Sequence, residues 1–181
     1  MRKECRFNGY GGQGIILAGI ILAEAAGVYE GQHVVQVQDY GPAARGDSST
    51  TDVIISDSTI DFPKATRLDL LVALSQRGFE QHNKFLRENG TIIADSDNVH
   101  PGSSKGVRRF PLTEIACEQT GGPLGVSIVA LGATVALTGI VKLESVKKSM
   151  LERVPGPTKE NNLAALMAGY TVAHDRKKRK A

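Results

Sequence analysis

Short apolar runs alternate with segments of helical periodicity through the first hundred residues of the chain. Short apolar or alternating runs are typical of strands, whereas apolar residues spaced three and four apart indicate a helix. In the first run, Cys5 and Phe7 fall on one face of an expected strand. The expected strands are residues 4–8, 34–37, 53–55, 70–74 and 91–94, and the expected helices among them are 15–29 and 78–88.

After residue 110 the pattern becomes helical. The four helices expected there are 112–119, 124–138, 143–153 and 159–174. Strands separated by helix-length segments form a parallel sheet with helices packed on it. The sequence therefore predicts one α/β domain over residues 1–175: a Rossmann-like, mostly parallel sheet covered by helices, with a helical C-terminal third. Residues 176–181 are expected to form a basic, disordered tail.

Three glycines recur every seven residues around the expected helix 124–138: Gly125, Gly132 and Gly139. On one helix they would share a stripe, and that stripe would let another element approach closely. Each glycine weakens a helix by roughly 1 kcal/mol relative to alanine, which suggests a packing reason for keeping them. The partner is either another subunit or, as we expect, the chain's own core.

A glycine-rich loop joins the first strand to the first helix. Residues 9–14 (GYGGQG) match the motif G-x-G-x-x-G. This motif suits a ligand site because glycine lets the backbone approach a ligand closely and the start of the helix offers unpaired N–H groups. Asp39 ends the second strand, where a ribose-binding acid would lie. Three interpretations stay open: a dinucleotide site, a site for another phosphate-bearing ligand, and tight strand-to-helix packing without a ligand. Gln13 is expected to point toward whatever the loop faces.

Residues 40–50 (YGPAARGDSST) form a second candidate loop. The guanidinium of Arg45 suits bidentate binding of a phosphate or carboxylate, and a salt bridge to Asp47 or Asp52 is the alternative. Tyr40 suits stacking on an adenine or packing on a subunit. Ser48 suits donation to an anion or a role in the turn. Both loops follow strands, so we expect them side by side at the carboxyl edge of the sheet.

Composition limits the chemistry of the chain. Cys5 and Cys117 are its only cysteines, too few for an iron–sulfur cluster or a four-cysteine zinc site, and no metal site is predicted. Low cysteine content fits a cytoplasmic location. The five basic residues 176–180 carry more positive charge than the net +3 of the whole chain, so the remainder of the chain is slightly acidic. No nucleic-acid partner is therefore expected. Residues 121–141 are uncharged and long enough to span a membrane, but their five glycines and one proline favour a buried helix.

Six blocks of sequence, taken in order, resemble the gamma subunit or gamma domain of 2-oxoacid:ferredoxin oxidoreductases. The blocks are residues 9–26 (GYGGQGIILAGIILAEAA), 40–46 (YGPAARG), 52–57 (DVIISD), 69–76 (DLLVALSQ), 129–144 (VALGATVALTGIVKLE), and 152–155 (ERVP) with 162–170 (NLAALMAGY). The ALSQ and ERVP blocks are most similar to the 2-oxoglutarate branch, with the pyruvate, branched-chain and indolepyruvate enzymes as neighbours. Two positions differ from the family pattern. Asp47 stands where family members commonly have a second glycine, and Ser127 stands where they often have asparagine.

The resemblance implies a subunit of an enzyme that decarboxylates a 2-oxoacid, passes two electrons to ferredoxin and transfers the acyl group to coenzyme A. In that family the alpha and beta subunits bind thiamine diphosphate with Mg²⁺, and beta or a ferredoxin-like delta subunit binds the [4Fe–4S] clusters. This chain would bind no cofactor tightly, supply no catalytic residue and be inactive alone. It would assist coenzyme A binding and active-site closure. The residues implied are Gly9, Gly11, Gly12, Gln13, Gly14, Tyr40, Arg45 and Ser48.

Two other classes of function remain open from the residues alone. One is a stand-alone NAD-dependent oxidoreductase with a Rossmann domain, and the other is a non-catalytic nucleotide-binding protein. The four histidines fall in unrelated contexts, so none marks a hydride-transfer site. Titration with NADH, coenzyme A and ADP separates these classes.

Overall fold

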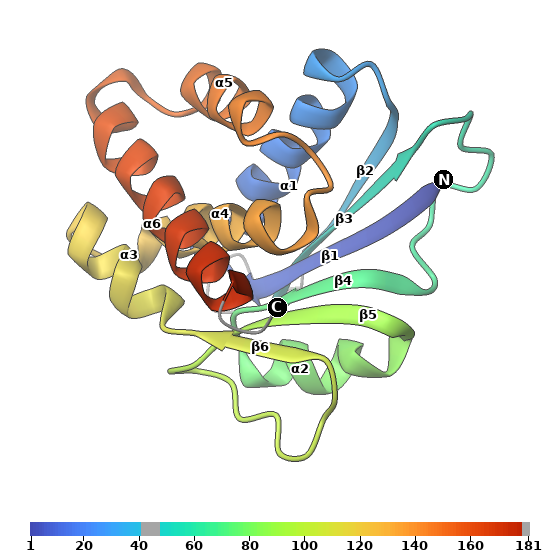
Figure 1. The fold of residues 1–181 in the computed structure, drawn as a ribbon, viewed down its shortest axis with the longest axis horizontal. Coiled ribbons are helices and arrows are strands. Elements are labelled where there is room, and N and C mark those ends of the chain that lie inside the picture. Colours follow the sequence, from blue (N-terminus) through green and yellow to red (C-terminus); the bar gives the residue numbers. More distant parts are fainter. Residues whose placement is uncertain (41–47, 179–181) are drawn as a thin grey trace.

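A computed structural model describes residues 1–40 and 48–178 and arranges them around one six-stranded sheet (Figure 1). The strand order is β2-β3-β1-β4-β5-β6, so that the first strand of the chain lies inside the sheet. The strands are β1 (Arg2–Tyr10), β2 (His33–Tyr40), β3 (Ser48–Ser56), β4 (Leu68–Ala73), β5 (Leu86–Asp95) and β6 (Val107–Phe110).

Helices follow the strands and then dominate the C-terminal third, as the sequence predicts. The helices are α1 (Ile15–Glu24), α2 (Gln76–His82), α3 (Leu112–Thr120), α4 (Val126–Thr138), α5 (Leu143–Arg153) and α6 (Lys159–Lys178). A π-helical turn (Ala25–Tyr29) extends α1, and a 3₁₀ turn (Asn83–Phe85) extends α2.

Five strands share one direction, and β3 runs against them. The predicted α/β, mostly parallel sheet is therefore confirmed, with one correction: β3 is antiparallel to both of its neighbours. Only residues 41–47 connect β2 to β3, whereas a parallel crossover needs about a dozen residues or more. A short connection between two strands gives a hairpin. The hairpin loop itself, which carries Arg45, lies outside the described residues.

The segment after β4 also differs from the prediction. The expected helix 78–88 is shorter, because α2 and its 3₁₀ turn end before Leu86, where β5 already begins. Leu86 and Thr91 of β5 pair with Leu68 and Leu70 of β4, so that the residues between them bulge out of the ladder. Strand β6 is not predicted at all. Its two central arginines are typical of an edge strand, which keeps its free side charged.

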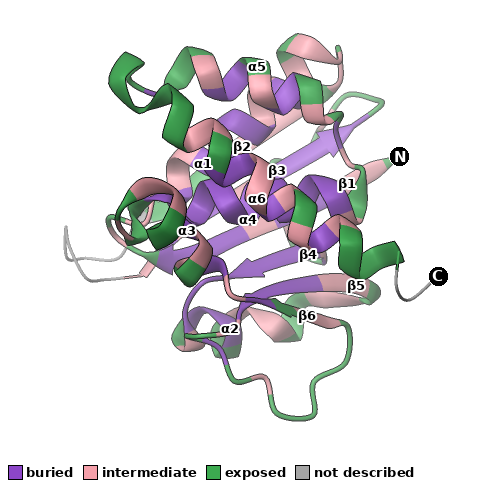
Figure 2. Cartoon of the chain, turned by 60° about the vertical axis from the view of Figure 1, so that its left-hand side comes forward, coloured by how far each residue is buried: buried purple, intermediate pink, exposed green. Residues whose placement is uncertain are grey.

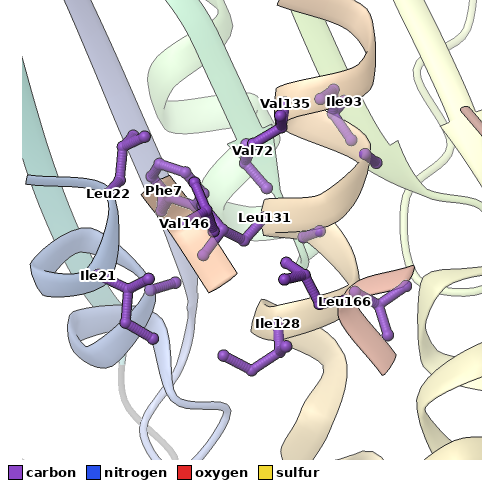
Figure 3. Close-up of a cluster of buried hydrophobic side chains, with 14 of the residues drawn as sticks. Phe7, Ile21, Leu22, Val72, Ile93, Ile128, Leu131, Val135, Val146 and Leu166 are labelled. Carbon is purple, nitrogen blue, oxygen red and sulfur yellow. The ribbon is translucent and has the colours of Figure 1, made fainter. Parts of the chain in front are cut away.

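The main core lies between one face of the sheet and the layer formed by α1, α3, α4, α5 and α6 (Figures 1 and 2). In Figure 3, Phe7 of β1, Val72 of β4 and Leu131 of α4 lie close together, and Leu22 of α1 lies beside Phe7. Helix α2 lies on the opposite face, where Phe79 packs over β4 and β5 in a smaller cluster. Helices on both faces explain why β4 and the residue after it are continuously apolar from Leu70 to Leu74.

Helix α4 crosses the middle of the main layer, and every residue from Val126 to Ala136 is buried. The buried helix expected within residues 121–141 is therefore confirmed. Across the part of the chain that the structure describes, no single helix has both the length and the apolar character needed to span a membrane. Only α3 taken together with Pro123–Thr138 meets that requirement, and the pair is bent by 119°.

Two glycines bring the backbones of α4 and α6 into direct contact. A Cβ at Gly132 would lie 2.1 Å from the carbonyl oxygen of Leu166, and a Cβ at Gly169 would lie 2.0 Å from that of Val129. The expectation that Gly132 packs against the chain's own core is confirmed, with α6 as the partner. The expected three-glycine stripe is wrong: Gly125 precedes α4 and faces Thr120, and Gly139 ends α4 in the left-handed region at φ 61°.

The basic run near the C-terminus is partly ordered. Residues 176–178 form the last turn of α6, so the expectation of a disordered tail is wrong for them. Arg176 donates to the carbonyl oxygen of Arg109. The Nζ of Lys177 lies 3.2 Å from the carbonyl oxygen of Leu137, where the C-terminal end of the α4 dipole favours a cation. The remaining three residues of the tail lie outside the described part of the chain.

Replacing Gly132 with alanine tests the α4–α6 contact. The added Cβ would force the two helices apart, and overpacking of this kind costs about 1–3 kcal/mol, more than the gain in helix propensity. Urea unfolding of the purified chain should show a lower midpoint for Gly132→Ala. The matched control is Gly156→Ala, whose Cβ would meet no atom within 4 Å. Equal midpoints for the two variants would contradict the close contact.

Candidate functional site

Strands β1 and β4 are parallel neighbours, and the segments that follow them pack on opposite faces of the sheet. After β1 the chain enters α1, whose Ile15, Ala18 and Ile21 belong to the main core, and after β4 it enters α2, whose Phe79 belongs to the opposite cluster. Such a topological switch point, at the carboxyl ends of adjacent parallel strands, is where open α/β sheets bind ligands. The candidate site is therefore the edge formed by the ends of β1 and β4.

At the other end of the same edge, Asp95 has a structural role. Asp95 ends β5 and is fully buried. Its Oδ1 accepts from the backbone N–H of Leu112 at 3.0 Å, and its Oδ2 accepts from the hydroxyl of Thr113 at 2.5 Å. This carboxylate thus caps the start of α3. It leaves the ends of β1 and β4 and the start of β3 as the part of the edge that could serve a ligand or a partner.

The chain's own packing accounts for several glycines of the loop between β1 and α1. A Cβ at Gly9 would lie 2.4 Å from the Oε1 of Gln13. Gly14 adopts φ 76° and leaves room for the Oγ of Ser127, which would lie 2.7 Å from its Cβ. Gly12 adopts φ 99° with no atom within 4 Å of its missing Cβ, so backbone conformation explains this glycine. These observations favour the packing interpretation for Gly9 and Gly14.

The side chain of Gln13 turns back onto the loop. Its Oε1 accepts from the backbone N–H of Tyr10 at 2.7 Å. The amide therefore stabilises the turn that contains Gly11 and Gly12, rather than pointing away from it as expected. The side chain of Tyr10 is 40% exposed beside this turn.

The flanks of the two predicted loops meet at one edge, as expected from their positions after strands. Gly9 pairs with Ser49 and Tyr10 pairs with Ser48, which begins β3. Tyr40 ends β2 and pairs with Ser49 from the other side. The flanks of both loops therefore lie within one ladder. The predicted anion ligand Arg45 and one of its two alternative partners, Asp47, lie outside the described residues. The other alternative partner, Asp52, is held by Arg6.

The strand order disfavours a dinucleotide site. In a Rossmann site the ribose-binding acid ends the strand next to the one that carries the glycine loop. Here β3 lies between β1 and β2, so Asp39 is two strand spacings, about 10 Å, from the glycine loop. This separation weakens the interpretation of Asp39 as a ribose ligand.

A buried asparagine joins the three segments of the candidate site. Asn8 is fully buried on β1. Its Nδ2 donates to Ser48 Oγ at 2.9 Å and to Thr50 Oγ1 at 2.8 Å, both on β3. Its Oδ1 accepts from Ser75 Oγ at 3.2 Å, and Ser75 is the N-cap of α2. Sequence reasoning missed Asn8 and Ser75. The alternation of polar and apolar residues along β1 was the one signal that could have drawn attention to Asn8.

Next to Asn8 on the same face lies an ion pair with a histidine. The guanidinium of Arg6 binds the carboxylate of Asp52 through two bonds of 2.6 and 2.7 Å. Its third nitrogen lies 3.3 Å from Nδ1 of His82. Because arginine can only donate, Nδ1 must accept and the ring is neutral. Burial, together with the charge of Arg6, lowers the pKa of His82 to about 4. These residues line a hollow of about 360 Å³ under β2 and β3.

Comparison with known families matches residues 4–172 to the model of pyruvate ferredoxin/flavodoxin oxidoreductases. The chain belongs to this family. The resemblance found in the sequence blocks is thereby confirmed over nearly the whole chain.

Individual members of the oxidoreductase family agree with this assignment. The chain is 45% identical to 2-oxoglutarate synthase subunit KorC of Methanocaldococcus jannaschii, over 97% of this chain and 96% of that protein. It is 43% identical to the gamma subunit of a keto/oxoacid ferredoxin oxidoreductase from Geobacter sulfurreducens PCA, with a TM-score of 0.85 and coverage of 96% and 97%.

A third relative in the oxidoreductase family shows the fold within a longer chain. The 2-oxoglutarate:ferredoxin oxidoreductase of Magnetococcus marinus, whose structure holds 2-oxoglutarate, coenzyme A and succinyl-CoA, matches with a TM-score of 0.82. It is 21% identical, and the match covers 96% of this chain but 31% of that one. At this identity the match shows the fold alone.

The neutral histidine predicts how the stability of this oxidoreductase subunit depends on pH. In the unfolded chain His82 binds a proton near its ordinary pKa of about 6.5, whereas the folded ring resists protonation down to about 4. Its contribution to stability is therefore complete above about pH 6.5 and is lost as the pH falls toward 4. Because the ring is only half-buried, the loss is about 1 kcal/mol.

Chemical unfolding between pH 4 and 7 measures this contribution. His82→Gln, which keeps an acceptor for Arg6, should flatten the pH dependence over that interval. His100→Gln removes an exposed imidazole and should keep the wild-type slope. If both variants keep that slope, His82 is not the group responsible.

Proposed function

We propose that this chain is the gamma subunit of a 2-oxoglutarate:ferredoxin oxidoreductase and that its carboxyl edge assists coenzyme A binding and active-site closure. The assignment of the substrate is supported by the near-full-length relative that is named a 2-oxoglutarate synthase subunit. One geometric observation carries the role of the edge. The glycine loop, the start of β3 and the N-cap of α2 converge at the switch point of the sheet.

The donors at this edge suit an anionic ligand such as the phosphates of coenzyme A. Ser48 and Ser49 begin β3 directly after the hairpin that carries Arg45. Backbone N–H groups, hydroxyls and a guanidinium bind phosphate through charge-assisted hydrogen bonds. In the proposal, Arg45 and Ser48 contact coenzyme A, Tyr40 packs beside it or on a partner, and Gly11 and Gly12 let the neighbouring chain approach.

The redox groups of the reaction belong to the partner subunits in this proposal. A [4Fe–4S] cluster needs four cysteine ligands, whereas Cys5 is buried within β1 and Cys117 is exposed on α3. Within residues 1–40 and 48–178, no three histidine, cysteine or acidic side chains gather as metal ligands would. The donor set of this chain therefore does not fit a cluster. Alpha and beta subunits would hold thiamine diphosphate and Mg²⁺, and the beta subunit or a delta subunit would hold the clusters. Ferredoxin would accept the electrons.

Reconstitution tests the assignment to a complex. The purified chain alone should contain no iron and no thiamine diphosphate and should turn over no 2-oxoacid with a viologen acceptor. The native complex, purified through a tag on this chain, should decarboxylate 2-oxoglutarate and require coenzyme A. Turnover by the chain alone, or a calorimetric titration showing that it binds NADH, would favour the stand-alone oxidoreductase instead.

Arg45→Ala in the complex tests the contact with coenzyme A. Loss of one charge-assisted hydrogen bond, worth about 1.5–3 kcal/mol, should raise the KM for coenzyme A by about ten- to a hundredfold. Exchange of carbon dioxide into the 2-oxoacid needs no coenzyme A and should fall by a much smaller factor. Lys105→Ala removes an exposed positive charge before β6, away from this edge, and serves as the control. An unchanged KM for Arg45→Ala would show that Arg45 does not contact coenzyme A and would favour a salt bridge within its loop.

A further inference from the structure

The amide of Asn8 hydrogen-bonds to both β3 and the start of α2. Both hydrogens of its Nδ2 are used, one by Ser48 and one by Thr50, which lie two residues apart on one face of β3. Its Oδ1 is used by Ser75. This arrangement fixes which way the amide points, because the nitrogen must face β3 and the oxygen must face α2.

The start of α2 is built around the same amide. Ser75 Oγ accepts from the backbone N–H of Gly78 at 3.1 Å while it donates to Asn8. A Cβ at Gly78 would lie 1.5 Å from the Oδ1 of Asn8, so any larger residue would displace the amide. Position 78 is therefore glycine for close approach to Asn8. The chain Gly78–Ser75–Asn8–Thr50 links α2 to β3 across the end of β1.

We propose that Asn8 is a positioning residue for coenzyme A: it holds the start of β3 in register with the glycine loop, so that the donors of this edge are preorganised. The proposal rests on the proposed function. Asn8 is fully buried and contacts no ligand itself. It acts through Ser48 and Thr50, and a preorganised donor set binds more tightly because less ordering is needed on binding.

Three substitutions at neighbouring threonines of β3 test the link without removing the asparagine. Thr50→Val keeps the shape of the side chain but removes the hydroxyl that Asn8 binds, whereas Thr50→Ser keeps the hydroxyl. Thr51→Val is the control at the neighbouring position: Thr51 is fully buried, whereas Thr50 is half-buried, and Thr51 bonds Gln36 and the carbonyl oxygen of Val37 on β2 instead.

In the native complex, Thr50→Val should raise the KM for coenzyme A by about three- to tenfold, the effect of one lost hydrogen bond, with a smaller change in kcat. Thr50→Ser should restore the wild-type KM, and Thr51→Val should keep it. In the purified chain, amide hydrogen exchange over residues 48–51 should quicken in Thr50→Val relative to Thr50→Ser.

Arg45→Ala in the same assay distinguishes the two ideas. If Arg45→Ala raises the KM and Thr50→Val does not, the positioning role is wrong and the proposed function stands. If neither variant changes the KM, the coenzyme A function is wrong and the positioning role falls with it. Equal KM values for Thr50→Val and Thr51→Val, both raised, would show a general loosening of β3 and would also overturn the proposal.

Discussion

Strand β1 must pair three polar side chains on a face that the fold buries or half-buries. Glu4, Arg6 and Asn8 alternate with Cys5 and Phe7, whose side chains belong to the main core. A buried polar group without a partner costs about 1–3 kcal/mol, and a charge costs more. Each of the three is paired: Glu4 accepts from Arg2 and from two backbone N–H groups after β3, Arg6 binds Asp52, and Asn8 binds β3 and α2. The first strand is polar because its neighbours supply these partners.

Strand β3 supplies the partners for two of the three polar side chains on this face of β1. Its Asp52 and Thr50 lie opposite Arg6 and Asn8 in the antiparallel register, where directly paired side chains are in contact. A one-residue slip would turn both to the main core and leave Arg6 and Asn8 unpaired. The same insertion of β3 between β1 and β2 moves Asp39 away from the glycine loop. One set of pairings thus holds the sheet in register and removes the geometry of a dinucleotide site.

The predictions from the sequence succeed where burial alone sets the pattern. The bounds of α5 and the buried α4 follow from apolar periodicity, and both are confirmed. They fail where strand pairing or a distant partner decides. Strand β3 is antiparallel because of its short connection to β2, and β6 pairs only with β5 at the edge of the sheet. Arg176 and Lys177 hold the last turn of α6 by meeting distant carbonyl oxygens. The position of the candidate site follows from the glycine loop. The role of Asn8 does not, because its partners lie forty or more residues away along the chain.

Under the proposed function, this chain acts on catalysis through preorganisation of the edge that meets coenzyme A. Four uncharged side chains join the segments at the switch point: Asn8 bonds Ser48, Thr50 and Ser75. These hydrogen bonds are present without any ligand, so less ordering is needed when a ligand binds. An edge of this kind changes how tightly an anionic co-substrate is held more than it changes the bonds that break. Under the proposed function, substitutions here must therefore act on the KM for coenzyme A, whereas kcat is set by groups on the partner subunits.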